Sequence, residues 1–157
     1  MAMSSTTNSS RYYIPAFAGI YTALDRFMLP LLRITLGVIL IPHGCQKLFG
    51  WFGGAGFARF TQIFEGIGYK PGAFWVTLVA LTELVGGLML VFGVFTRFAA
   101  LAVVIFMINA VHFTSAKGFF WTAGGSEFPI LLLVVALVFL IKGGGDYSVD
   151  QAMSKEL

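Results

Sequence analysis

The chain has 157 residues, of which 58% are hydrophobic and only 11% are charged, and its formal net charge is +3. This composition, with a mean hydropathy of +0.88, lies outside the range of soluble domains and predicts helices that face lipid. The length fits one domain, and the ten Lys and Arg residues are scattered singly, so no basic patch predicts a nucleic-acid partner. Because Cys45 is the single cysteine, any redox reaction needs a cofactor, a quinone or a partner to carry electrons.

Residues 1–25 read as a polar N-terminal tail followed by an interfacial approach segment. Residues 1–10 are polar, which predicts disorder. Residues 12–24 are apolar but too short to span a bilayer, and Pro15 and Gly19 weaken them as a helix. We therefore expect this segment to lie at the level of the lipid headgroups.

Residues 26–142 are predicted to form a membrane domain with four spans. The expected spans lie at about 26–45, 74–95, 98–113 and 128–141. The nearly continuous apolar run over 74–113 is long enough for two crossings of roughly 20 residues each, with Arg97 marking the turn between them. The expected fold class is all-α, an integral membrane four-helix bundle.

The two ends of this domain set the expected topology. Gly143 to Gly145 end the last helix, and residues 143–157 are predicted to be a polar C-terminal tail. The distribution of Lys and Arg between the two sides favours cytoplasmic termini by the positive-inside rule.

The connection between the first two spans is predicted to contain a short amphipathic helix in the membrane interface. Phe57, Phe60, Ile63 and Phe64 recur at helical spacing on one side of it. A packed re-entry loop and a lid over a site both fit this pattern.

Polar and ionisable residues in or beside the spans are the candidates for a functional site. An ionisable group in a span costs a few kcal/mol even on lenient insertion scales, so it is by default a candidate for function. If the four spans form a bundle, eight such residues fall in the same half of the membrane. They are His43, Gln46, Lys47, Glu83, Asn109, His112, Lys117 and Glu127.

Several of these residues also have simpler interpretations. Lys47 fits an anchor that reaches the interface, His112 a hydrogen-bonded packing residue, and Glu127 a helix start favoured by the helix dipole. Glu83 lies well inside a span, so we expect it to be protonated, to pair with Lys47, Arg33 or His43, or to line a cavity. For Arg33 itself, a structural partnership with Glu83 or a backbone carbonyl is favoured.

Metal, haem and nucleotide chemistry have little support in the sequence. His43 and His112 could in principle ligate a haem iron, or join Glu83 or Glu127 at a metal. Neither HExxH nor paired cysteines accompany them, so no metal ligands are predicted. Phosphate-binding and nucleophile-elbow motifs are also missing from the sequence.

Several ordered motifs resemble the DoxX family of small four-helix membrane proteins. They are HGCQKLFGWFGG (43–54), ELVGGLMLVFGVFTRFAAL (83–101), HFTSAKGFF (112–120), GGSEFPILLL (124–133) and GGGDYSVD (143–150). The similarity covers roughly residues 26–150. It departs at Asp146, where a basic residue is expected before Tyr147.

The resemblance implies a bacterial-type inner-membrane protein that serves as a component of an oxidoreductase system. Some relatives are membrane subunits of quinone-linked thiosulfate oxidation. The positions that match the family motifs coincide with all of the eight candidates except Asn109.

Our leading hypothesis from the sequence is a membrane subunit that binds a quinone headgroup, with a soluble redox protein as a further partner. The predicted catalytic residues are His43, Lys47, Glu83, His112 and Glu127, which would donate hydrogen bonds or relay protons. Gln46, Asn109 and Lys117 are predicted to bind the cofactor. An accessory protein that docks a soluble partner and a small-solute carrier remain alternatives, and a homo-oligomer is compatible with all three.

Overall fold

The computed structural model describes residues 13–153, and within that range the chain forms helices and turns without any strand. The all-α fold class is therefore confirmed. The predictions for residues 1–10 and for the last four residues fall outside the described range.

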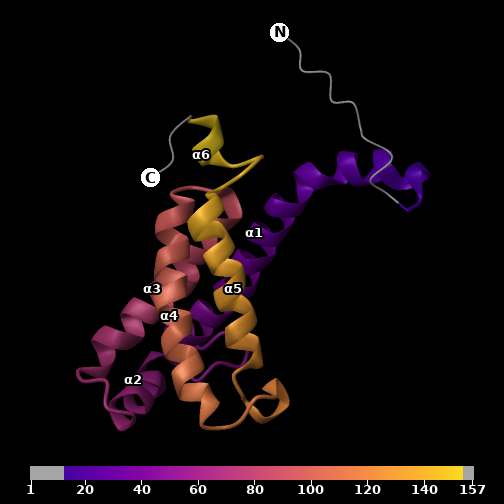
Figure 1. The fold of residues 1–157 in the computed structure, drawn as a ribbon. Helices are drawn as coiled ribbons and strands as arrows, with labels where there is room; N and C mark the ends of the chain where they lie inside the picture. The colour runs from indigo at the N-terminus through magenta and orange to yellow at the C-terminus, as the bar shows by residue number, and fades with distance from the viewer. Residues whose placement is uncertain (1–12, 154–157) are drawn as a thin grey trace.

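Four long helices run alongside one another over much of their length (Figure 1). They are α1 (Ala18–Phe49), α3 (Gly72–Phe92), α4 (Thr96–Ser115) and α5 (Glu127–Lys142). Two of the described helices, α3 and α4, are long and apolar enough to cross a membrane. The bounds of α3, α4 and α5 lie close to those of the last three predicted spans. Helix α5 is the shortest of the four long helices, with 16 residues.

Short elements occupy the two ends of the molecule. A 3-10 turn, η2 (Pro15–Phe17), precedes α1, and a second, η3 (Trp121–Ala123), precedes α5. Helix α2 (Gly56–Gly66) lies beside the end of α1 and the start of α3, at the same end of the molecule as the α4–α5 connection (Figure 1). We call this the α2 end. Helix α6 (Val149–Ala152) lies at the other end, which we call the tail end.

Helix α1 starts well before the predicted first span. It begins at Ala18 rather than near residue 26, so residues 18–25 belong to the same helix as the predicted first span, and their position at the headgroup level stays a prediction. Pro15 stands at the start of η2, a position that tolerates proline, and Thr22 donates a hydrogen bond back to the Ala18 carbonyl. The helix bends where its first part leaves the other helices (Figure 1). Pro30 inside α1 accounts for a bend, because proline removes a helical hydrogen bond.

Glycines allow α1 and α3 to approach closely. A methyl group on Gly37 would overlap the backbone carbonyl of Gly87, and one on Gly44 would lie 2.8 Å from Cβ of Leu84. Small residues at a helix crossing let backbones pack directly, which is the usual basis of helix association in lipid. This crossing fixes the positions of the polar groups that α1 and α3 carry.

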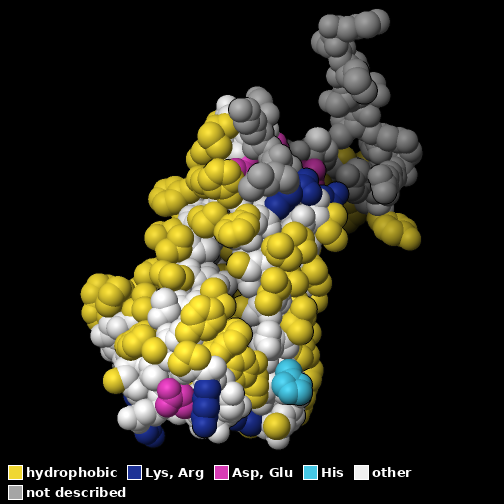
Figure 2. Space-filling view, turned by 90° about the vertical axis from the view of Figure 1, so that its left-hand side faces the viewer, with side chains coloured by type: hydrophobic (Ala, Val, Ile, Leu, Met, Phe, Trp, Pro, Cys, Tyr) yellow, Lys and Arg dark blue, Asp and Glu magenta, His cyan; other side chains and the backbone are white. Residues whose placement is uncertain are grey.

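The surface and the interior of the molecule are both apolar in its middle part. Buried residues from α1, α3, α4 and α5, among them Leu40, Leu90, Val103 and Phe139, form one core. On the face shown in Figure 2, hydrophobic side chains cover the middle, whereas charged and His side chains gather toward the two ends. This distribution fits an apolar exterior in lipid with polar ends at the interfaces.

The C-terminal segment packs onto the tail end instead of forming only a polar tail. Arg33, just 1% exposed, donates hydrogen bonds to the carbonyls of Gly144 (2.7 Å) and Tyr147 (2.9 Å). The buried carboxylate of Asp150 accepts hydrogen bonds from the backbone N–H groups of Phe95 (2.7 Å) and Thr96 (2.8 Å) at the start of α4. Composition predicted a polar tail, and its Asp150 carboxylate supplies the hydrogen-bond partners that the first backbone N–H groups of α4 need.

Candidate functional site

A buried ion pair joins α1 to α3 toward the α2 end. The ammonium nitrogen of Lys47 lies 2.7 Å from each carboxylate oxygen of Glu83. The side chain of Lys47 is 12% exposed and that of Glu83 only 4%. Of the three partners predicted for Glu83, the structure therefore shows Lys47. Such a pair offsets the cost of burying its charges only when its geometry is good, as it is here.

The surroundings of this pair come from α1 and α2. The Lys47 ammonium also lies 3.4 Å from the backbone carbonyl of His43 and 5.4 Å from the centre of the Phe60 ring on α2. Gln46 donates to the carbonyl of Phe52 in the α1–α2 connection at 3.2 Å. Gln46 therefore holds the loop, while Lys47 lies between an acid on α3 and an aromatic ring on α2.

The remaining predicted residues lie nearby in the fold but in separate contacts. His112, in the last turn of α4, is exposed, and its described contact is an edge contact with the ring of Phe113, 5.3 Å between centres. Glu127, the first residue of α5, accepts a hydrogen bond from the backbone N–H of Trp121 at 2.8 Å. Lys117 is exposed in the α4–α5 connection, and the His43 side chain is also exposed. Among the described residues no three metal-ligating side chains lie together.

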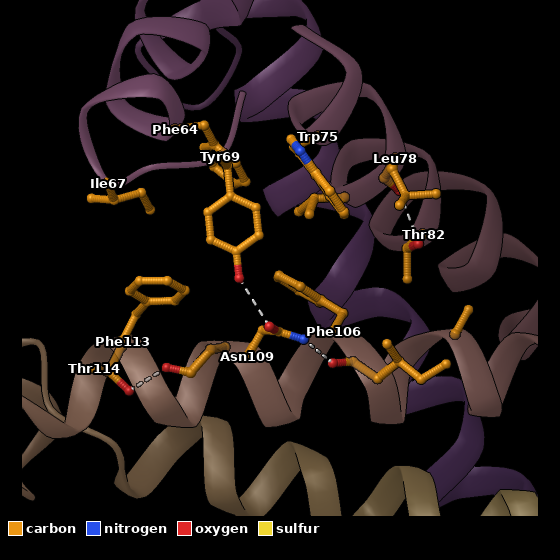
Figure 3. A pocket seen from close by; sticks show the side chains of 14 residues that line it. Phe64, Ile67, Tyr69, Trp75, Leu78, Thr82, Phe106, Asn109, Phe113 and Thr114 are labelled. Atoms are coloured by element: carbon orange, nitrogen blue, oxygen red, sulfur yellow. Dashed lines mark hydrogen bonds between the residues drawn. The ribbon is translucent and has the colours of Figure 1, made fainter. Parts of the chain in front are cut away.

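A large apolar cavity lies elsewhere in the same half, between α2, α3 and α4. Its volume is about 680 Å³. Figure 3 shows its lining side chains converging from these helices and from the α2–α3 connection. The lining residues are Phe64, Ile67, Tyr69, Trp75, Leu78, Val79, Thr82, Ala102, Ile105, Phe106, Asn109, Ala110, Phe113 and Thr114. Of the eight predicted site residues, Asn109 alone is among them.

A phenol and an amide form the polar spot of this cavity. The Tyr69 hydroxyl donates to the amide oxygen of Asn109 at 3.0 Å, and the Asn109 amide nitrogen donates to the Ile105 carbonyl at 2.8 Å (Figure 3). The Tyr69 ring makes edge contacts with the rings of Trp75 (5.1 Å) and Phe113 (5.5 Å). Sequence reasoning missed Tyr69 because it lies in a loop, and its position over α4 depends on the course of that loop.

The ion pair and the cavity share two helices. On α3, Thr82 lines the cavity while its sequence neighbour Glu83 pairs with Lys47. On α2, Phe60 lies against Lys47 and Phe64, one turn later on the same face, lines the cavity. The two features are therefore adjacent, with the same segments forming part of each.

Comparison with known proteins identifies relatives over most of the chain. The family model described as DoxX matches residues 28–116. A Bacillus subtilis protein named "Putative oxidoreductase CatD" is 30% identical over 125 residues, which cover 80% of this chain and 86% of that protein. An uncharacterised membrane protein of Mycobacterium tuberculosis is 30% identical over 135 residues, covering 79% of this chain and 80% of the relative.

A third relative is an uncharacterised protein of Haemophilus influenzae. It is 28% identical over 134 residues, which cover 83% of this chain and 93% of that protein. No solved structure gives a significant match.

Proposed function

The chain belongs to the DoxX family of membrane proteins, and from that premise we propose that it is the membrane subunit of a quinone-linked oxidoreductase system. In this proposal α1, α3, α4 and α5 are four spans of a bacterial inner membrane, and both termini are cytoplasmic. The name of the Bacillus subtilis relative supports the reaction class. The observation that carries the proposal is the buried Lys47–Glu83 pair.

In this proposal the Lys47–Glu83 pair delivers protons to the quinone. Reduction of a quinone to a quinol consumes two electrons and two protons. In the proposal a soluble redox protein supplies the electrons at the α2 end, and the pair passes protons one at a time. A side chain that is still 12% exposed gives Lys47 access to water for reprotonation. An acid and a base in direct contact can pass a proton between them, whereas the apolar side chains that face lipid cannot.

Extraction of quinone is the first test. The protein is purified in native lipid, extracted with organic solvent and assayed for quinone per mole of folded protein. We expect a stoichiometric amount. Folded protein that carries no quinone would instead support an accessory role, in which the Lys47–Glu83 pair locks α1 to α3 and the α2 end docks a soluble partner.

The second test asks whether the pair delivers protons. Reduction of the bound quinone by dithionite is followed by stopped-flow absorbance. Loss of a general acid typically slows a proton-dependent step by about 100-fold or more, so Glu83→Gln should slow the reduction by that factor. Glu65→Gln makes the same chemical change on exposed α2 and should leave the rate unchanged. Equal rates in the wild type and Glu83→Gln would remove the pair from the reaction.

A further inference from the structure

We propose that the cavity between α2, α3 and α4 binds the ring of a neutral, membrane-soluble carbonyl compound. Its identification as a quinone ring rests on the function proposed above. The volume of about 680 Å³ lies within the range of small-molecule sites, which is about 300–1,000 Å³. The site therefore differs from the polar cluster on which the sequence-based prediction was centred.

The lining of the cavity selects for an uncharged ligand. All fourteen lining residues are uncharged, and most of them are apolar or aromatic. A charged group placed there would lose its hydration without gaining an opposite charge, which is strongly unfavourable. A neutral ring loses little hydration and gains contact with the walls.

The polar spot of the cavity selects for a carbonyl group. An Asn amide has two N–H donors, and one of those of Asn109 is engaged by the Ile105 carbonyl. The second can donate to a ligand carbonyl, and the Tyr69 oxygen can still accept a hydrogen bond. A quinone carbonyl uses the donor, and the hydroxyl of the reduced quinol can use the acceptor. The same pair of residues thus serves both redox states of one ring.

The walls of the cavity favour a flat ring that enters from the bilayer. The rings of Tyr69, Trp75 and Phe113 surround the polar spot at the edge-to-face distances typical of aromatic clusters. Leu78 on α3 and Ile105 on α4 line the cavity and are 47% and 55% exposed, so the cavity opens to the surface of the molecule at these residues. In a membrane these exposed side chains meet lipid, so a lipid-dissolved compound reaches the cavity without crossing water.

Fluorescence of Trp75 provides a direct binding test. The substitutions Trp51→Phe and Trp121→Phe leave Trp75 as the single tryptophan of the full chain. The protein is placed in lipid nanodiscs and titrated with a benzoquinone that carries a decyl tail, which quenches nearby tryptophan. We expect saturable quenching in this background.

Three substitutions in this background locate the bound ring. Ala110→Phe fills the cavity and should abolish saturable quenching. Asn109→Leu removes the donor and should weaken binding about tenfold, the effect of losing one hydrogen bond. The control Ala58→Phe makes the same change as the first on an exposed position of α2 and should bind as the background does. Quenching that is unaffected by both cavity substitutions would overturn the proposal.

Competition separates ring recognition from tail recognition. Decylbenzene carries the same tail but no carbonyl groups, and we expect it to displace the quinone at least tenfold less well. Equal displacement would show an acyl-chain site and would overturn the proposal. The assay needs no electron transfer. Saturable binding without extractable native quinone would therefore count against the proposed function alone, whereas extractable quinone without saturable quenching would count against this inference alone.

Discussion

Helix α1 carries two cations, the buried Arg33 and the mostly buried Lys47, whose hydrogen-bond partners differ in kind. Arg33, toward the tail end, donates to the backbone carbonyls of Gly144 and Tyr147 in the segment after α5. Lys47, toward the α2 end, contacts the carboxylate of Glu83 on α3. Both side chains lie in a helix with an apolar exterior, so both need partners to offset the cost of burial.

The partners indicate what each cation does. Carbonyl groups do not exchange protons at ordinary pH, and a guanidinium stays charged, so the tail end is a structural lock. A lysine and a glutamate can each gain or lose a proton, so the α2 end has the components of a proton relay. Loss of a structural lock lowers the stability of the protein, whereas loss of a proton relay slows the reduction of the quinone.

Breaking the ion pair on one side should have the largest effect on stability. Glu83→Leu leaves the mostly buried Lys47 ammonium without a carboxylate, and removal of one partner from a buried pair typically costs about 3–5 kcal/mol. Unfolding in a denaturing detergent titration measures the free energy change. A loss of unfolding free energy below about 1 kcal/mol would show that Lys47 reaches water or lipid headgroups without Glu83, and that the ion pair contributes little to stability.

Removing Arg33 should destabilise the tail end somewhat less. Arg33→Met deletes two hydrogen bonds from a charged donor, and we expect a loss of about 3 kcal/mol. Limited proteolysis should then cleave the segment after α5 faster, while α1–α3 packing is retained. The control Arg59→Met removes an exposed arginine of α2 and should change neither readout. Unchanged proteolysis in Arg33→Met would contradict the lock.

Loss of the Asp150 carboxylate should have a smaller effect at the same end. Asp150→Ala removes the acceptors for the first backbone N–H groups of α4, and loss of such a cap costs about 1–2 kcal/mol. Thermal unfolding of the purified protein measures it. The exposed Asp146 offers a matched control as Asp146→Ala. Equal effects of the two substitutions would argue against a specific role for Asp150 as a cap.

Replacing both members of the ion pair should have the smallest effect on stability and a large one on the reaction. A Lys47→Met and Glu83→Leu double variant exchanges the pair for apolar side chains, a change that is often neutral within about 1 kcal/mol. It should therefore fold and yet reduce bound quinone as slowly as Glu83→Gln. A stable double variant that reacts at the wild-type rate would assign the α2 end to structure as well.

Much of the helical fold could be predicted because its signals are local. The apolar run of α3 and α4 is broken at Gly93, and α5 ends at Lys142, just before Gly143; both glycines adopt positive φ angles. The start of α1 was missed because residues 18–25 are apolar without reaching span length, and hydropathy does not show that the helix continues through Pro30.

Sequence by itself determined which residues are expensive to bury and limited the partners expected for Glu83 to Lys47, Arg33 and His43. An acid in mid-helix needs a cation, and Lys47 at the end of α1 was among the candidates because antiparallel neighbours bring those positions together. Tertiary structure alone decided that the C-terminal segment supplies hydrogen-bond acceptors to Arg33 and to the start of α4. It also decided that the Tyr69 hydroxyl donates to Asn109 in the cavity. Such contacts depend on helix rotation and on the course of loops. Hydropathy and spacing fix neither, because they show which side of a helix is apolar but not which neighbour that side contacts or how a loop runs.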